Sequence, residues 1–261
     1  LTPKVIAYDA ELNIAIYEWI EGDHLQSVEN EHIDQALNFI KILQDIETPE
    51  FSKPASEACT SAEQLFHQIE ERHKKLDSIE NNILHNFLNT IFKPLYLDVK
   101  NWSTQQWPAN NFHEILASVK QTLSPSDFGI HNTIMRSDGT LCFLDLEYFG
   151  WDDPVKLIAD FIWHPAMTLN DDHKKRWVKN SFLIFKNGEE LKQRFHAAWP
   201  LYGMRWAMIL LNEFREDGWN KKLHVDENLE KLREQKHREQ LDKAVAVCDL
   251  IKSHQIECPY V

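Results

Sequence analysis

Glycine is scarce in this chain, with only seven among 261 residues. None of the seven belongs to a glycine-rich loop of either common phosphate-binding spacing, which excludes a P-loop and a dinucleotide-binding fingerprint. The four cysteines show neither a Cys-x-x-Cys pair nor a zinc-site spacing. Cys142 and Cys248 lie among apolar residues, so we expect buried free thiols and a reducing, cytoplasmic environment.

Basic clusters and long apolar runs are missing as well. The formal net charge is -13, which would repel a phosphate backbone over most of the surface, so nucleic acid is not an expected partner. No apolar run approaches the roughly 18 residues of a membrane-spanning helix, so no membrane span is predicted. The length is sufficient for one large domain or two small ones.

Hydrophobic periodicity predicts a mostly helical α+β fold. Residues 4–8 and 13–20 are short β-branched and aromatic runs, which are typical of a strand hairpin. From Glu31 the apolar residues follow helical spacing, and Thr60 with Glu63 has the spacing of a capping box. Further helices are predicted over residues 81–93, 112–122, 172–186, 189–198, 201–215 and 226–253, with an irregular connection after Pro94.

A second hairpin is predicted in the middle of the chain. Two apolar runs flank Ser137-Asp138-Gly139, and Asp-Gly between such runs is a strong turn signal. Beyond this hairpin, Asp152 or Asp153 is expected to cap a helix that carries Pro154 in its first turn.

The sequence LSPSDFGIHN, at residues 123–132, directly precedes this hairpin and is too polar for a core segment. By itself it is compatible with a proline-led turn in which Asp127 caps the backbone. However, Asn132 leaves the loop just before the first strand, and Asp145 ends the second strand. Because a hairpin returns its second strand beside its first, we expect these side chains and Glu147 to converge at one end.

Convergent carboxylates repel one another unless a cation lies among them, and hard oxygen ligands of this kind suit Mg²⁺. In phosphoryl transfer the protein positions the groups, neutralises charge through the metal, and offers one carboxylate to the attacking hydroxyl. We therefore predict Asp127 as the catalytic base and Asn132 and Asp145 as metal ligands. Glu147 is expected to approach the metal, contact a cationic substrate or hold the loop, and the sequence leaves all three open.

The arrangement resembles the aminoglycoside phosphotransferase and choline kinase superfamily, which shares the protein-kinase-like fold. The loop of that family typically runs His-Gly-Asp, four residues and Asn, followed by an Ile-Asp-Phe-Glu-like strand and an aromatic-rich turn that ends in Asp-Pro. The matching segments here, in the same order, are Pro125-Ser126-Asp127, Asn132, Leu144–Tyr148 and Gly150–Pro154. The likeness covers most of residues 1–165 and, more loosely, the helical remainder.

This resemblance implies a kinase-like large lobe over residues 27–261, preceded by the end of a small lobe and a hinge over residues 1–26. In the hinge, the backbone around Glu18, Trp19 and Ile20 would meet the adenine edge of ATP. The implied activity is an ATP- and Mg²⁺-dependent phosphotransferase acting on a hydroxyl of a small molecule, such as an amino alcohol, sugar or aminoglycoside. The acidic composition suits a cationic or neutral acceptor better than an anionic one.

Two features depart from the family pattern. Pro125 stands where the family usually has histidine, so the sequence does not show which residue supports the catalytic loop. The glycine-rich strand pair and the phosphate-binding lysine are missing upstream, and the first residue is Leu1, so we expect an incomplete chain. The alternative is a kinase-like binding or regulatory module that does not transfer phosphate. Trp151 and Trp163 are interpreted as core residues rather than as the walls of a cation pocket.

Overall fold

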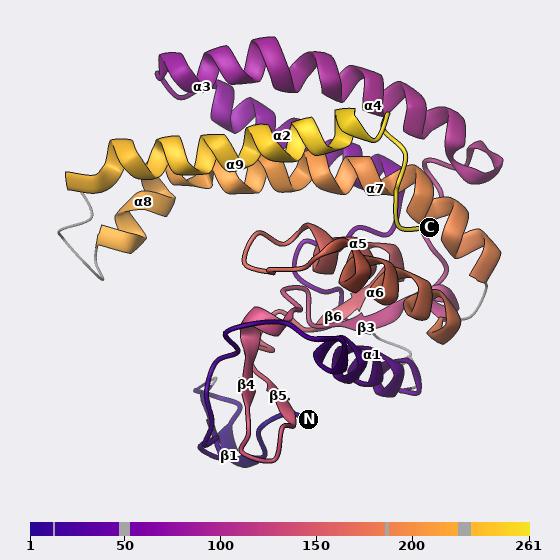
Figure 1. The fold of residues 1–261 in the computed structure, drawn as a ribbon, viewed down its shortest axis with the longest axis vertical. Helices are drawn as coiled ribbons and strands as arrows, with labels where there is room; N and C mark the ends of the chain where they lie inside the picture. Colours follow the sequence, from indigo (N-terminus) through magenta and orange to yellow (C-terminus); the bar gives the residue numbers. More distant parts are fainter. Residues whose placement is uncertain (13, 47–52, 186–187, 224–230) are drawn as a thin grey trace. The chain divides into compact units, whose positions relative to one another are not determined.

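The computed structural model describes residues 1–12, 14–46, 53–185, 188–223 and 231–261. The chain divides into two compact units, each assembled from segments that are far apart in sequence (Figure 1). Unit 1 consists of Leu1–Thr60, Leu116–Leu191 and Tyr260–Val261, and unit 2 consists of Ser61–Ile115 and Lys192–Pro259. The candidate site residues all lie in unit 1, and the lobe boundary at residue 26 stays a prediction.

The described part of unit 1 contains three small antiparallel sheets, each of two strands. One pairs β1 (Val5–Asp9) with β2 (Ile14–Tyr17), and another pairs β4 (Thr133–Met135) with β5 (Leu141–Phe143), which confirms both predicted hairpins. The third pairs β3 (Thr122–Ser124) with β6 (Gly150–Asp152). This last pairing was not predicted, because its two strands are only three residues long and far apart in sequence.

Helices α1, α5 and α6 complete this unit. Helix α1 (Asn30–Gln44) buries the apolar face that the spacing predicts. Helix α5 (Pro154–Trp163) is buried along its whole length, and the Asp153 carboxylate caps it by accepting the Val155 N–H at 2.8 Å, as the Asp-Pro pair predicts. Helix α6 (Asp171–Ile184) begins after an equivalent cap at Asn170.

Aromatic rings anchor the loop that carries Asp127. The Phe128 ring lies 5.3 Å from Phe39 of α1 and 5.1 Å from Phe143 of β5, measured between centroids. Because Phe128 is buried among these rings, the neighbouring Asp127 faces a more open environment and is only half-buried. The core thus fixes the backbone from which the predicted base projects.

The structure also bears out two predictions about burial, one for a pair of tryptophans and one for the cysteines. Trp151 and Trp163 are 6% and 7% exposed, so both are core residues. All four cysteines are free and buried.

The described part of unit 2 is helical, and none of the described helices in the chain is long and apolar enough to cross a membrane. Its elements are α2 (Ala62–Asp77), α3 (Asn82–Phe87), α4 (Lys93–Gln106), most of α7 (Gly188–Leu210), α8 (Glu216–Leu223) and α9 (Arg233–Ser253).

Two helix boundaries in unit 2 were predicted wrongly. The cap of α2 is Ser61, whose hydroxyl accepts the Gln64 N–H at 3.2 Å, and not Thr60. The helix after residue 81 does not end before Pro94, because a π-helical segment at Leu88–Phe92 joins α3 to α4. Pro94 therefore lies in the first turn of α4, where its missing N–H costs little.

Four further helix predictions need correction. Residues 112–122 hold only a 3₁₀ turn at Ser118–Lys120 before β3 begins. The predicted helices 189–198 and 201–215 instead share one helix, α7, which continues through Pro200 because buried neighbours outweigh one lost hydrogen bond. The predicted helix 226–253 begins at Arg233, and residues 226–230 of that prediction lie outside the described residues.

Candidate active site

The register of the β4–β5 hairpin brings Asn132 and Asp145 to the same end. Thr133 pairs with Phe143, and one step further out the Leu144 N–H donates to the Asn132 carbonyl at 2.8 Å. Asp145 follows directly and has a left-handed backbone, with φ of 56°. This conformation is uncommon for an aspartate and is concentrated at functional sites, where the surrounding structure maintains it.

The Asn132 amide has a defined orientation. Its Nδ2 donates to the backbone carbonyl of Asp127 at 3.0 Å. The side-chain oxygen of Asn132 is thereby left as an acceptor, which is the atom that a metal ligand needs. The Asp127 N–H in turn donates to the Pro125 carbonyl at 2.9 Å, next to a left-handed Ser126, so the backbone itself closes this turn.

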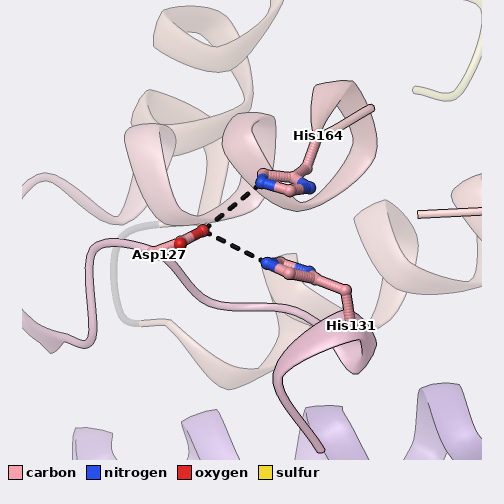
Figure 2. A group of neighbouring side chains, drawn as sticks. All are labelled: Asp127, His131 and His164. Carbon is pink, nitrogen blue, oxygen red and sulfur yellow. Dashed lines mark hydrogen bonds and ion pairs between the residues drawn. The ribbon is translucent and has the colours of Figure 1, made fainter. Parts of the chain in front are cut away.

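Two imidazoles contact the Asp127 carboxylate (Figure 2). The Nε2 atoms of His131 and His164 lie 3.3 Å and 3.4 Å from the same oxygen, Oδ1. His131 belongs to a 3₁₀ turn at Ile130–Asn132, and His164 caps the C-terminus of α5. The two rings are stacked, with centroids 3.9 Å apart and an angle of 9° between their planes.

Sequence reasoning missed this pair. The i, i+4 spacing of His131 from Asp127 is only a weak signal in the sequence. Nothing in the sequence associates His164 with the loop, because only the packing of α5 brings it there.

Electrostatics favour a charged Asp127 beside a neutral His164. The hydrogen bond from His131 lowers the pKa of Asp127, against the opposing effect of burial. Burial lowers the pKa of His164 to about 4, and the neighbouring His131 acts in the same direction. The lowered pKa keeps Asp127 deprotonated at neutral pH, which is the state that a proton acceptor requires.

The three side chains are poorly arranged for a metal of their own. Their potential ligand atoms all lie within 4.8 Å of one another. However, an imidazole binds a metal through a lone pair in the ring plane, at about 2.0–2.1 Å for zinc. The stacked rings of His131 and His164 direct these lone pairs side by side, so a shared ion would lie well outside both ring planes. We therefore interpret the cluster as a hydrogen-bonding arrangement.

The donor set at Asp145 fits Mg²⁺ better. Burial raises the pKa of Asp145, and the nearby Glu147 and Asp127 carboxylates raise it further. These carboxylates thus share one region of space, and a divalent cation with oxygen ligands would relieve their repulsion. Glu147 also accepts a hydrogen bond from Tyr148, whose pKa this bond raises.

The three predicted hinge residues line one cavity of about 670 Å³ together with Asp145 and Glu147, whereas Asn132 and Asp127 are not among its lining residues. Its walls are mostly apolar with a few carboxylates, which is typical of small-molecule sites. The lining residues include Val5, Tyr17, Glu18, Trp19, Ile20, Ile134, Leu144, Asp145, Leu146 and Glu147.

Of the three hinge residues, Glu18 already uses its backbone N–H in the first hairpin, where it donates to the Lys4 carbonyl at 2.9 Å. The backbones of Trp19 and Ile20 therefore remain as the more suitable contacts for an adenine edge, and the Trp19 side chain is 85% exposed.

The sequence matches no protein-family model and no curated protein. Solved structures do match in fold. A choline/ethanolamine kinase family protein from Mesorhizobium loti is 12% identical with a TM-score of 0.53, covering 98% of this chain and 74% of its own. An ethanolamine kinase from Plasmodium vivax is 16% identical with a TM-score of 0.54, covering 98% and 70%. A choline kinase from Cryptosporidium parvum is 12% identical with a TM-score of 0.53, covering 98% and 75%. The chain therefore has the kinase-like fold of the choline and ethanolamine kinases, as the order of its motifs predicted.

Proposed function

We propose that this chain is an ATP- and Mg²⁺-dependent phosphotransferase that acts on a hydroxyl of a small molecule. The observation that carries the proposal is the meeting of Asn132 and Asp145 at one end of the β4–β5 hairpin, next to Asp127. The same end of the hairpin borders a cavity of about 670 Å³ in a fold that small-molecule kinases share.

In the proposed reaction, Asp127 accepts the proton of the acceptor hydroxyl. The hydroxyl oxygen forms a bond to the γ-phosphorus of ATP while the bond between that phosphorus and the ADP oxygen breaks. Asn132 Oδ1 and the Asp145 carboxylate would hold Mg²⁺. When bound, this ion would supply positive charge to the phosphate oxygens, as in other phosphoryl transfers.

The nucleotide is assigned to the cavity beside Asp145. Its apolar walls suit a base, and the backbones of Trp19 and Ile20 can hydrogen-bond the adenine edge. Glu147 lines the same cavity, so we propose that it assists the metal or orients a cationic group.

An amino alcohol is the first acceptor to test. The compared structures are those of choline and ethanolamine kinases, and the carboxylates of Asp127, Asp145 and Glu147 would attract a cation. Sugars and aminoglycosides are the other two classes of acceptor to be tested. The buried free thiols are consistent with a reducing, cytoplasmic location, which stays a prediction.

The test is transfer of γ-³²P from ATP to a panel of choline, ethanolamine, simple sugars and aminoglycosides, with Mg²⁺ present or chelated. The assay should use the full-length product of the gene. We expect Asp127→Asn to lower turnover about 100-fold or more while ATP binding stays intact, because the proton acceptor is lost. Asp138→Asn is the matched control, since this exposed aspartate only closes the turn of the same hairpin.

The alternative is a kinase-like binding or regulatory module that does not transfer phosphate, because the phosphate-binding lysine and the glycine-rich strand pair of the family pattern have no match in these residues. A thermal shift with Mg²⁺–ATP but no transfer to any acceptor would favour this module. Normal turnover in Asp127→Asn would refute the assignment of the base.

A further inference from the structure

An aspartate that serves as a base must present one oxygen to the substrate in a fixed direction. The terminal torsion of aspartate is broad, so an unrestrained carboxylate samples many orientations. Asp127 lies in a loop with a left-handed residue, Ser126, immediately before it. The direction of its carboxylate must therefore be set by contacts to its oxygens.

We propose that His131 and His164 form an imidazole clamp that fixes Asp127 Oδ1 and leaves Oδ2 to accept the proton of the acceptor hydroxyl. The clamp rests on the proposed function and names two positioning residues for it. Both Nε2 atoms approach the same oxygen, at 3.3 Å and 3.4 Å, and they come from separate elements (Figure 2). Because the two attachment points are independent, the carboxylate cannot rotate without breaking at least one contact.

The proton positions support this assignment. A carboxylate can only accept, so a hydrogen bond to Asp127 requires a proton on the facing nitrogen. The Ala166 N–H points at His164 Nδ1, at 3.2 Å, which makes Nδ1 an acceptor. The neutral His164 ring therefore carries its proton on Nε2, the nitrogen that faces Asp127. The distances are long for hydrogen bonds, as catalytic hydrogen bonds often are in structures without substrate.

The His131 ring packs closely against the loop backbone at Gly129. A Cβ atom on residue 129 would lie only 2.5 Å from His131 Nδ1 and 2.9 Å from Met167 Sδ, so glycine is required there for the ring to pack. The Ile130 N–H donates to Met167 Sδ at 3.2 Å, which ties this loop to the segment that follows His164. The loop that carries His131 and the segment after His164 are thus in direct contact.

The clamp would supply the support for the catalytic loop that Pro125 cannot give in place of the histidine of the family pattern. The histidines here lie after Asp127 and at the end of α5 instead. They contact the carboxylate itself.

Paired substitutions separate the clamp from a general packing role. In glutamine the side-chain amide nitrogen can occupy nearly the position of Nε2, whereas in asparagine it falls short. We expect His164→Asn and His131→Asn to lower kcat about 10- to 100-fold with little change in KM for ATP. We expect the matching glutamine variants to retain kcat within roughly fivefold of the parent. Equal losses in the asparagine and glutamine variants, or unchanged kcat in both, would overturn the clamp.

A second measurement needs no turnover and therefore separates the clamp from the proposed function. Long-range ¹H–¹⁵N spectra of the histidine-labelled protein report the tautomer of each ring, and the His164 signal is identified by its loss in His164→Gln. We expect the Nε2–H tautomer at pH 7.5 and a shift of this nitrogen in Asp127→Asn. That result would support the clamp even if no acceptor were found. A proton on Nδ1, or no response to Asp127→Asn, would refute the clamp even in an active kinase.

Gly129→Ala provides a test that leaves both histidines in place. The added methyl should displace the His131 ring and lower kcat about tenfold or more. Gly188→Ala is the matched control, because its Cβ would meet only the Phe182 carbonyl at an ordinary 3.6 Å. Full turnover in Gly129→Ala would contradict the role of His131.

Discussion

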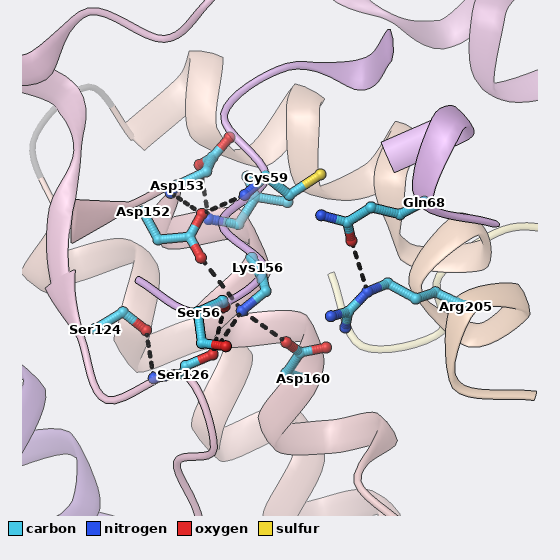
Figure 3. A network of polar contacts seen from close by, with 11 residues as sticks. Ser56, Cys59, Gln68, Ser124, Ser126, Asp152, Asp153, Lys156, Asp160 and Arg205 are labelled. Carbon is cyan, nitrogen blue, oxygen red and sulfur yellow. Dashed lines mark hydrogen bonds and ion pairs between the residues drawn. The ribbon is translucent and has the colours of Figure 1, made fainter. Parts of the chain in front are cut away.

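Replacing Lys156 with methionine should strongly destabilise the unit that carries the site. The Lys156 ammonium lies 3.2 Å from Asp152 Oδ2 and 3.3 Å from Asp160 Oδ2 (Figure 3). The three side chains are at most 9% exposed, so water cannot replace the lost cation. Lys156 Nζ also reaches Ser126 Oγ at 3.4 Å, next to the predicted base.

The magnitude follows from the geometry. Each ion pair at this distance is worth about 5 kcal/mol at an effective dielectric constant of about 20. Burial of the charges costs several kcal/mol per ion, so the intact network contributes little net stability. Lys156→Met removes the attraction but leaves both aspartates buried. The free energy of unfolding should therefore fall by about 3–5 kcal/mol.

Urea unfolding followed by tryptophan fluorescence measures this loss. Lys175→Met is the matched control, because Lys175 is exposed on α6 and its replacement should change stability by less than about 0.5 kcal/mol. The triple variant Asp152→Asn, Lys156→Met and Asp160→Asn should regain much of the lost stability, since it buries no unpaired charge. If Lys156→Met unfolds within about 1 kcal/mol of the parent, the electrostatic reasoning is wrong.

Three further predictions concern pH, backbone packing and the metal site. Because the pKa of His164 is lowered to about 4 from its ordinary 6.5, the unfolded state binds more protons below pH 6.5. Stability should therefore fall by up to about 3 kcal/mol between pH 6.5 and pH 4, and the same urea titration in His164→Gln should show a smaller fall. Gly150→Ala should lower the free energy of unfolding, measured in urea, by about 1–3 kcal/mol, because its Cβ would lie 2.3 Å from the Ala55 nitrogen. An unchanged free energy of unfolding would show that this backbone can move. Asp145→Asn should abolish most of the thermal shift produced by Mg²⁺–ATP, whereas Asp138→Asn should retain it; a full shift in Asp145→Asn would remove Asp145 from the metal site.

The predictable parts of the site are those that local rules govern. Asp138-Gly139 fixes the turn of the central hairpin, and this turn brings Asn132 and Asp145 together through strand register. The sequence also predicted the start of α5, because an aspartate cap followed by proline is a local signal. The family resemblance added the fold, which the compared structures bear out.

The failures occur where the surrounding structure overrides a local signal. Pro94 and Pro200 mark helix breaks in the sequence, yet helices pass through or begin at both because of π-helical and packing adjustments. Residues 112–122 look helical, yet the Leu116 N–H is used by the carbonyl of Thr60.

By itself, the sequence determined the order of the chemical groups along the chain and the hairpin that gathers Asn132 with Asp145, since register depends on neighbours in sequence. Only the tertiary structure decided that the stacked rings of His164 and His131 would contact the same oxygen of Asp127, and that Lys156 would lie between two aspartates. Those contacts depend on where α5 packs, which is set by the buried aromatic core and has no counterpart in residue spacing.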